Sequence, residues 1–295
     1  MSLYLIIICN KLALTKKKIR VLFMSNRITR ILVATFAIPV LLCFAYLGRI
    51  PFLVLIIAIG LAVFFEFSKI VGKKNIFPSN LIGYISVALL ILNSYFNLFS
   101  YNIFFLVLIP ILLVIELFRN KESAISNISA NLLAILYAGF FASTIVSIRE
   151  FSINLTTKYV YGGYIIISIL ITLWMTDSAA YFIGTAFGKH KLFPRVSPKK
   201  SWEGAIAGFI FAAISLIILK ILLLTFLNWI DIIAFIIIIG IFGQIGDLIE
   251  SLIKRDAGVK DSSNLIPGHG GIFDRFDSLL FSAPIIYLYL ILFLK

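Results

Sequence analysis

Long, uninterrupted apolar runs dominate this chain and limit what it can fold into. Residues 50–65 and 232–246 contain no ionisable side chain, and 61% of the 295 residues are apolar while only 13% are charged. A soluble domain averages about a quarter charged residues. In a bilayer every backbone polar group must be bonded within the protein, which leaves helices and closed barrels. Because the runs are continuous rather than alternating, the sequence predicts an all-α, polytopic membrane protein.

The number of spans follows from length, since a membrane helix needs about 20 mostly apolar residues. About nine stretches approach this length, and no Gly-, Pro- or Ser-rich linker separates them, so we expect one transmembrane domain over 31–295. The expected spans are 31–48, 50–68, 80–98, 101–118, 131–148, 160–187, 204–226, 229–252 and 276–294.

Basic residues predict the orientation. With the N-terminus in the cytoplasm, 21 of the 26 Lys and Arg residues fall in cytoplasmic segments. This bias is the positive-inside pattern, and it explains most of the net charge of +13 without a nucleic-acid partner. We therefore expect a multi-pass protein of the cell inner (plasma) membrane that binds no nucleic acid.

Residues 1–30 form a basic N-terminal segment that we expect in the cytoplasm. Its apolar run 3–9 is short for a secretory signal, and the basic cluster follows the run instead of preceding it. Met24 begins a more ordinary start, MSNRITRILVATF, so the true start codon stays open between Met1 and Met24.

Cysteine and histidine are too few for several kinds of metal centre. The chain has two cysteines, Cys9 and Cys43, and two histidines, His190 and His269. This inventory argues against structural zinc, haem, iron–sulfur clusters and a disulfide framework.

The aspartates gather in the second half of the chain. All seven follow position 176, and six of them fall near the cytoplasmic ends of the predicted spans or in the cytoplasmic loops. Asp177 lies within a span, where an ionisable group is costly unless it faces a partner or a cavity. A helix–helix hydrogen bond is the plainer alternative for Asp177, with Gly184 and Gly188 as close-packing positions. We favour a functional role for Asp177 because an ionisable group inside a span is costly.

The eighth span ends in a face of polar residues. Asp247, Glu250, Ser251 and Lys254 are spaced i, i+3, i+4 and i+7, so they lie on one side of a helix. An ion pair between Glu250 and Lys254 would explain why these two residues lie on the same face. It leaves Asp247, one turn deeper, unexplained, and a cation bound by Asp247 would explain it.

The segment after this helix is a glycine-rich loop. It contains Gly258, Pro267 and the run Gly268-His-Gly-Gly271, which predict a structured turn rather than a helix. Backbone N–H groups of such a loop approach phosphate closely. Asp274 and Asp277 follow the loop. The structural alternatives are a solvated loop acid for Asp274 and a helix N-cap for Asp277. Carboxylates, basic residues and a Gly-rich loop on one face together predict Mg²⁺ holding a polyphosphate.

Two long motifs resemble the signature of phosphatidate cytidylyltransferases, the CDP-diglyceride synthases. The first runs through Ser251-Leu-Ile-Lys-Arg255, Lys260-Asp261, Pro267-Gly-His-Gly-Gly271 and Asp274-Arg-Phe-Asp277. The second includes Asp177-Ser-Ala-Ala-Tyr181, Gly184, Gly188-Lys-His190 and Ser197-Pro-Lys-Lys-Ser-Trp-Glu-Gly204. The match covers residues 170–280, the expected catalytic half. Ser263 and Asn264 depart from the family pattern, which more often has Gly and a variable residue there.

The resemblance implies the reaction of CTP with phosphatidate to give CDP-diacylglycerol and pyrophosphate, with Mg²⁺ and with a second cation as an option. It also implies a homodimer in contact with membrane lipid and an active site on the cytoplasmic face. The catalytic residues would be Asp247, Asp274, Asp277, Lys254 and Arg255, and the metal ligands Asp247, Asp274, Asp277 and Asp261, with Asp177 as a further candidate. The substrate-binding residues would be Asp177, Ser197, Lys199, Lys200, Ser201, Glu203, Ser251, Lys260, Pro267, Gly268, His269, Gly270, Gly271 and Arg275.

Some roles stay open within this hypothesis. Lys199 and Lys200 suit anionic lipid head groups as well as substrate phosphate. Ser201 is also a plausible helix N-cap, and His269 suits a loop-shaping hydrogen bond as well as a phosphate contact. Three other classes compete: an ion transporter, a CTP-dependent polyisoprenol kinase and a CDP-alcohol phosphotransferase. The acids cluster at one face without an inverted repeat, which argues against the transporter, and the aspartate run of the phosphotransferases is missing.

Overall fold

The computed structural model describes residues 26–151, 159–263, 265–266 and 270–294, with the side chains of 26–32 and 34 left out. Within these ranges the chain is almost entirely helical, as the apolar runs predict. The helices of the first half are α2 (Asn26–Leu47), α3 (Arg49–Gly72), α4 (Asn80–Phe96), α5 (Tyr101–Phe118), α6 (Ala124–Ile135) and α7 (Ala142–Arg149), with the π-helical stretch η1 (Leu136–Phe141) between α6 and α7.

The second half adds the helices that carry the acidic motifs. A short antiparallel hairpin, β1 paired with β2, joins α8 to α9. These elements are α8 (Val160–Phe187), β1 (Lys191–Phe193), β2 (Ser197–Ser201), α9 (Trp202–Leu222), α10 (Trp229–Ile237), the π-helical η2 (Ile238–Phe242), α11 (Gly243–Asp256) and α12 (Phe273–Phe293).

Seven helical segments of the described ranges are long and apolar enough to cross a membrane, so the expected count of nine is not confirmed. They are Arg49–Gly72, Tyr101–Phe118, Ala124–Arg149, Val160–Phe187, Trp202–Leu222, Trp229–Asp256 and Phe273–Phe293. Shorter apolar helices, Thr35–Leu47 and Asn80–Phe96, stand where the first and third spans are expected. The last segment begins earlier than the predicted residue 276, which brings Asp274 into its first turn.

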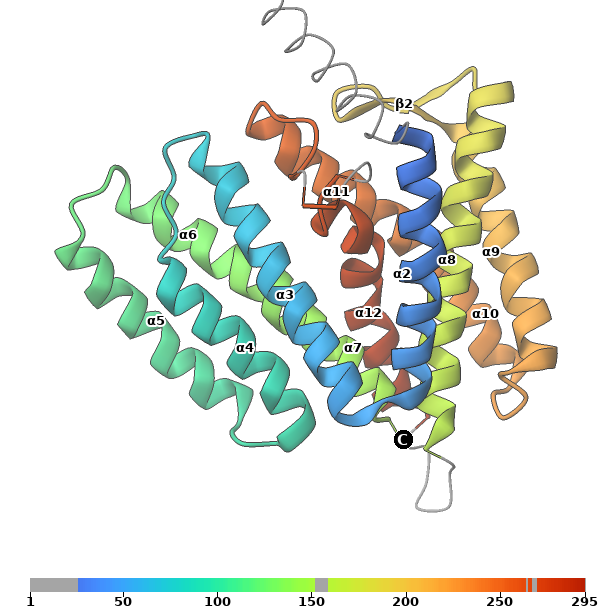
Figure 1. Ribbon diagram of the computed structural model, residues 1–295, viewed down its shortest axis with the longest axis horizontal. Coiled ribbons are helices and arrows are strands. Elements are labelled where there is room, and N and C mark those ends of the chain that lie inside the picture. The colour runs from blue at the N-terminus through green and yellow to red at the C-terminus, as the bar shows by residue number, and fades with distance from the viewer. Residues whose placement is uncertain (1–25, 152–158, 264, 267–269, 295) are drawn as a thin grey trace, which may run out of the picture.

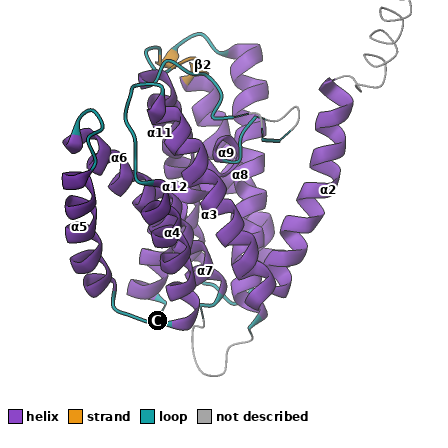
Figure 2. Ribbon diagram, turned by 60° about the vertical axis from the view of Figure 1, so that its left-hand side comes forward, coloured by secondary structure: helices purple, strands orange, loops and turns teal. Residues whose placement is uncertain are grey.

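The helices form two groups with α11 and α12 between them (Figure 1). On one side lie α3, α4, α5 and α6, and on the other lie α8, α9 and α10. Helix α12 packs against α3 of the first group and against α8 of the second, so it contacts both groups. In Figure 2 the N-terminal end of α2 stands apart from α8. The end of α3, the hairpin, the end of α11 and the start of α12 all lie at one end of the bundle (Figure 1).

Buried side chains fill the centre of this bundle. Phe64, Leu90, Ile169, Phe235 and Leu280 are fully buried, and they come from five different helices. Helix α5 contributes little to this core, since only three of its residues are buried. It is therefore a peripheral helix, while α12 is central.

Candidate functional site

Helix α11 presents the polar face that its spacing predicts. Glu250, Ser251 and Lys254 are buried, and Asp247 is half-buried one turn deeper. The Ser251 hydroxyl donates a hydrogen bond to Asp247 Oδ1 at 3.4 Å. The ion pair considered as an alternative is also present, because Lys254 Nζ lies 2.5 Å from Glu250 Oε2.

Three carboxylates from two helices converge beside this face. One oxygen each of Asp247, Glu250 and Asp277 lies within 4.8 Å of the others. Glu250 is 1% exposed, and its Oε1 has no hydrogen-bond partner among the described residues. Asp277 is 8% exposed, and its Oδ1 accepts the backbone N–H of Ser278 at 2.7 Å. Because a buried, unpartnered carboxylate oxygen is costly, the cluster is suited to a cation.

Asp274 lies in the same region but has other partners. Its Oδ1 is 2.6 Å from Lys254 Nζ, and its Oδ2 accepts hydrogen bonds from the Ser262 hydroxyl at 2.9 Å and from Gly271 N–H at 2.8 Å. Asp274 thus ties the glycine-rich loop to α11. Asp277 lies in the second turn of α12 rather than at its N-cap, which Ile272 occupies.

Glu66 is the residue of this region that the sequence reasoning missed. It lies in α3, far from the motifs, and is fully buried. Its two oxygens accept hydrogen bonds from the hydroxyls of Ser262 (2.9 Å) and Ser263 (2.5 Å) and from the N–H groups of Ile272 (2.9 Å) and Phe273 (2.7 Å). The carboxylate therefore binds both the loop and the N-terminus of α12, where a negative charge is favourable.

Gly271 makes the approach of Glu66 possible. A Cβ at this position would overlap the Ser262 hydroxyl and lie 2.5 Å from Glu66 Oε2. Any side chain here would separate the loop from its buried acceptor. The neighbouring Gly270 has φ +84°, a conformation that glycine adopts without strain.

Lys200 brings the β-hairpin to the carboxylate cluster. Its Nζ lies 2.6 Å from Asp247 Oδ2, and both side chains are partly exposed. Asp177, at the corresponding end of α8, is exposed and lies within electrostatic reach of Asp247, Lys200 and Arg275. Thus Asp177 and the hairpin do reach the site that the motifs predict.

The turn between α8 and α9 is held by short polar contacts and by glycines. Ser201 is the N-cap of α9, and its hydroxyl accepts the N–H of Gly204 at 3.2 Å. Glu203 Oε1 lies 2.7 Å from His190 Nδ1. A Cβ on Gly184 would lie 3.3 Å from Gly204 Cα in α9, and one on Gly188 would lie 2.5 Å from the Ser201 hydroxyl, so both glycines lie at close contacts with the start of α9.

The remaining predicted residues divide by position. Arg255 donates to Val196 O at 3.3 Å and Val259 O at 3.0 Å, so its guanidinium joins α11 to the hairpin. Pro267, Gly268 and His269 lie outside the described residues. Lys199, Lys260, Asp261 and Arg275 are exposed, and Ser197 is half-buried.

The balance of charge at the cluster favours a divalent cation. Asp247, Glu250, Asp274 and Asp277 carry four negative charges when ionised, and Lys200 and Lys254 supply two positive charges in direct contact with them. With all four ionised, two negative charges would be left without a partner lysine in a largely buried region, where uncompensated charge is expensive. Carboxylate oxygens are typical ligands of hard divalent cations such as Mg²⁺ and Ca²⁺.

Comparison with known proteins gives one consistent family. A model described as the cytidylyltransferase family matches residues 28–293. The phosphatidate cytidylyltransferase of Bacillus subtilis (strain 168) is 34% identical over 269 residues, which are 90% of this chain and 97% of the relative. That of Brucella suis is 34% identical over 270 residues, covering 90% and 94%. That of Staphylococcus saprophyticus is 44% identical over 131 residues, covering 44% and 50%.

Proposed function

The chain belongs to the cytidylyltransferase family, and we propose that it transfers CMP from CTP to phosphatidate, giving CDP-diacylglycerol and pyrophosphate. The reaction is a step of phospholipid biosynthesis. The observation that carries this proposal is the match along 90% of the chain to relatives of that name. The cluster of Asp247, Glu250 and Asp277 beside Lys200 and Lys254 supplies the chemistry that such a transfer needs.

For this reaction the protein must hold two anions, CTP and phosphatidate, close together. A phosphate oxygen of phosphatidate attacks the α-phosphorus of CTP, a new P–O bond forms, and the bond to the β-phosphate oxygen breaks. The lipid phosphate is already a nucleophile, so no strong general base is needed. Lys200, at the mouth of the cluster, would draw both phosphates together and offset charge on the leaving pyrophosphate.

We propose Mg²⁺ as the cofactor. Asp247, Glu250 and Asp277 would hold it, and when bound it neutralises phosphate oxygens during the transfer. Asp274 would act differently from the expected metal ligand, because it is not among the three carboxylates that converge and its oxygens contact Lys254, Ser262 and Gly271. Its role here is to position the loop.

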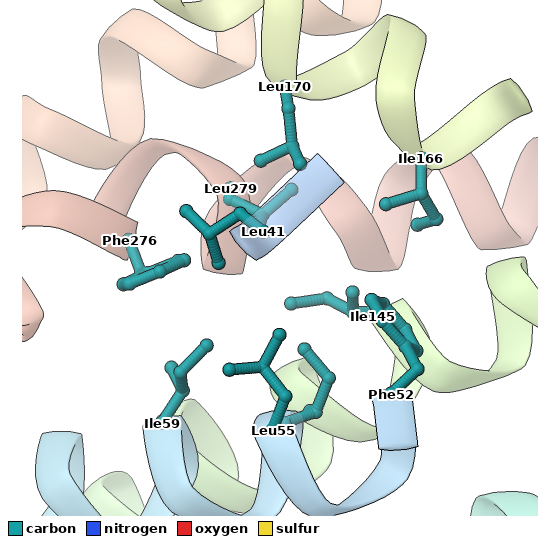
Figure 3. A pocket seen from close by; sticks show the side chains of 10 residues that line it. Leu41, Phe52, Leu55, Ile59, Ile145, Ile166, Leu170, Phe276 and Leu279 are labelled. Atoms are coloured by element: carbon teal, nitrogen blue, oxygen red, sulfur yellow. The ribbon is translucent and has the colours of Figure 1, made fainter. Parts of the chain in front are cut away.

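We place the lipid at the side of the bundle. An apolar cavity of about 10 Å³ lies between α2, α3, α7, α8 and α12, lined only by apolar side chains (Figure 3). Two of them, Phe276 and Leu279, lie next to and two residues after Asp277 in α12, so apolar side chains adjoin the carboxylate cluster, although the void itself is only about the size of one water. We further propose that the acyl chains enter between α8, α11 and α12, that the protein is a homodimer and that the site faces the cytoplasm.

The test uses membranes carrying the chain, labelled CTP, phosphatidate and Mg²⁺. Formation of CDP-diacylglycerol is expected. Phosphorylated polyprenol with CDP as the product would instead identify a polyprenol kinase and overturn the proposal.

Asp247→Asn and Asp277→Asn should each lower turnover by about two orders of magnitude or more, since each removes a charge at the metal and phosphates. Asp256→Asn is the matched control, because Asp256 lies on the same helix, 66% exposed and paired with Lys74. Both cluster variants should also need more Mg²⁺ for half-maximal rate. Near-normal turnover in either variant would remove that residue from the site.

A further inference from the structure

A second pocket opens at the end of the bundle that holds the carboxylate cluster. It measures about 460 Å³ and lies between the end of α3, the start of α4 and the turn from α5 to α6. The salt bridge from Lys74 Nζ to Asp256 Oδ2 (2.7 Å) joins the α3–α4 segment to the end of α11, so both sites lie on one face. The lining residues are Phe65, Ser68, Lys69, Ile76, Phe77, Pro78, Ser79, Asn80, Tyr84, Arg119 and Lys121.

The polar lining of this pocket is cationic. Lys69, Arg119 and Lys121 contribute positive charge, and none of the described residues that line the pocket is a carboxylate. Arg119 is held in place by Glu116, 3.0 Å away, and donates to Phe77 O at 2.9 Å. The carboxylate cluster needs a cation to receive phosphate, whereas this pocket can attract an anion directly.

Hydrogen-bond donors accompany the charge. Ser79 is the N-cap residue of α4, but its side chain makes no capping hydrogen bond to the first N–H groups of the helix. The Ser68 hydroxyl is buried in the same wall and has no hydrogen-bond partner among the described residues. An uncapped helix N-terminus beside basic side chains favours a phosphate group.

The pocket wall is fixed before a ligand arrives. Asn127 accepts the N–H of Phe77 at 2.7 Å and donates to Glu116 Oε1 at 2.6 Å and to Lys121 O at 2.7 Å. This buried amide ties the α3–α4 segment to the α5–α6 turn. Because the backbone around the pocket is held, a ligand loses less free energy to ordering the site.

Apolar surface continues outward from the same pocket. Leu81 and Ile85, which follow the lining residues Asn80 and Tyr84 along α4, are 70% and 48% exposed. A ligand whose phosphate occupies the basic end can place hydrocarbon against these side chains.

We propose that this pocket binds the phosphate group of an anionic membrane lipid, at a site separate from the carboxylate cluster. Lys69, Lys121 and the start of α4 hold the phosphate, and the outer face of α4 contacts the acyl chains. Binding needs no divalent cation, which distinguishes it from substrate binding at the cluster.

The experiment measures lipid binding to the full chain in neutral detergent with EDTA, by native mass spectrometry. The probe is phosphatidylglycerol, with phosphatidylcholine as the neutral comparison and inorganic phosphate as competitor. We expect one phosphatidylglycerol to bind and phosphatidylcholine to bind much more weakly. Lys69→Ala/Lys121→Ala should weaken phosphatidylglycerol binding about thirtyfold, as expected for two lysines near a lipid phosphate.

The matched control is Lys73→Ala/Lys220→Ala, which removes the same charge from residues that do not line the pocket. It should bind phosphatidylglycerol as the unchanged chain does, and both double variants should keep CDP-diacylglycerol synthesis and thermal stability. Equal binding by both variants, or equal loss in both, would overturn the proposal. Displacement of the lipid by inorganic phosphate at similar concentration would show a free-phosphate site and overturn the assignment to lipid.

Discussion

Glu66 shows how one buried carboxylate can organise a loop. Four donors from Ser262, Ser263, Ile272 and Phe273 converge on its two oxygens, and no water-exposed surface remains around it. The expected active-site loop is therefore held from the N-terminal half of the chain, which carries none of the recognisable motifs.

Replacing Glu66 with Gln should destabilise the loop by roughly 2–4 kcal/mol, because an NH₂ group would then face donors that need an acceptor. We expect a lower thermal unfolding temperature in detergent and at least a tenfold loss of CDP-diacylglycerol synthesis. Glu122→Gln changes the same chemical group at an exposed position and should affect neither. A Glu66→Gln protein with unchanged melting and activity would contradict this role.

Gly271 gives a second prediction at this scale. Gly271→Ala places a methyl group against Ser262 and Glu66, so we expect a cost of about 1–3 kcal/mol from overpacking. Gly72→Ala is the control, since a Cβ there meets nothing within 4 Å. Thermal unfolding of both variants checks the difference, and equal midpoints would argue against the tight contact.

Sequence reasoning reached only part of this site. The i, i+3, i+4, i+7 spacing correctly placed Asp247, Glu250 and Lys254 on one face of α11, because helical periodicity is local. Glu66 had a signal too, since a carboxylate inside an apolar run is costly. The cost of this carboxylate does not reveal which residues bind it, and its partner Ser262 lies 196 residues away in the sequence. The different surroundings of Asp274 and Asp277 likewise depend on tertiary contacts that spacing alone does not reveal.

At the scale of elements, the contacts between helix ends lead to a third prediction. Arg149, fully buried at the end of α7, donates to Ala45 O (2.6 Å) and Tyr46 O (2.8 Å) at the end of α2, and to Tyr159 O (3.2 Å) before α8. One guanidinium therefore joins three helices through carbonyls, two of which the last turn of α2 leaves unpaired.

Arg149→Met should lower stability by about 3 kcal/mol or more, because it removes three charge-assisted hydrogen bonds and leaves the three carbonyl oxygens without their donor. Arg195→Met, at an exposed position of the hairpin turn, is the control. Thermal unfolding in detergent is the measurement. A midpoint for Arg149→Met equal to that of the control would show that water or lipid replaces these bonds.

Helix types were easier to predict than helix lengths. Continuous apolar runs identify membrane helices, and every described segment expected to span is helical. Apolar content alone does not predict the shorter length of α4 or the π-helical stretches η1 and η2 within two spans. Both π-helical stretches pack against α12, whereas α4 packs against α3, α7 and η1.

The topology of the whole molecule can be tested directly. With native cysteines replaced by serine, single cysteines at Lys73 and Lys260 should react with an impermeant thiol reagent only from the cytoplasmic side. Cysteines at Asn97 and Asn228 should react only from the opposite side, as the positive-inside pattern predicts. Labelling of both pairs from one side would refute the proposed orientation.

The long separation between Glu66 and its donors also bears on how the protein is made. Ser262 and Phe273 follow Glu66 by 196 and 207 positions. At a synthesis rate of 5–20 residues per second, the ribosome needs roughly 10–40 s to produce them. During that interval α3 is already inserted while its carboxylate has none of its final partners. The carboxylate of α3 therefore gains its hydrogen-bond donors only when the loop after α11 and the start of α12 have been made.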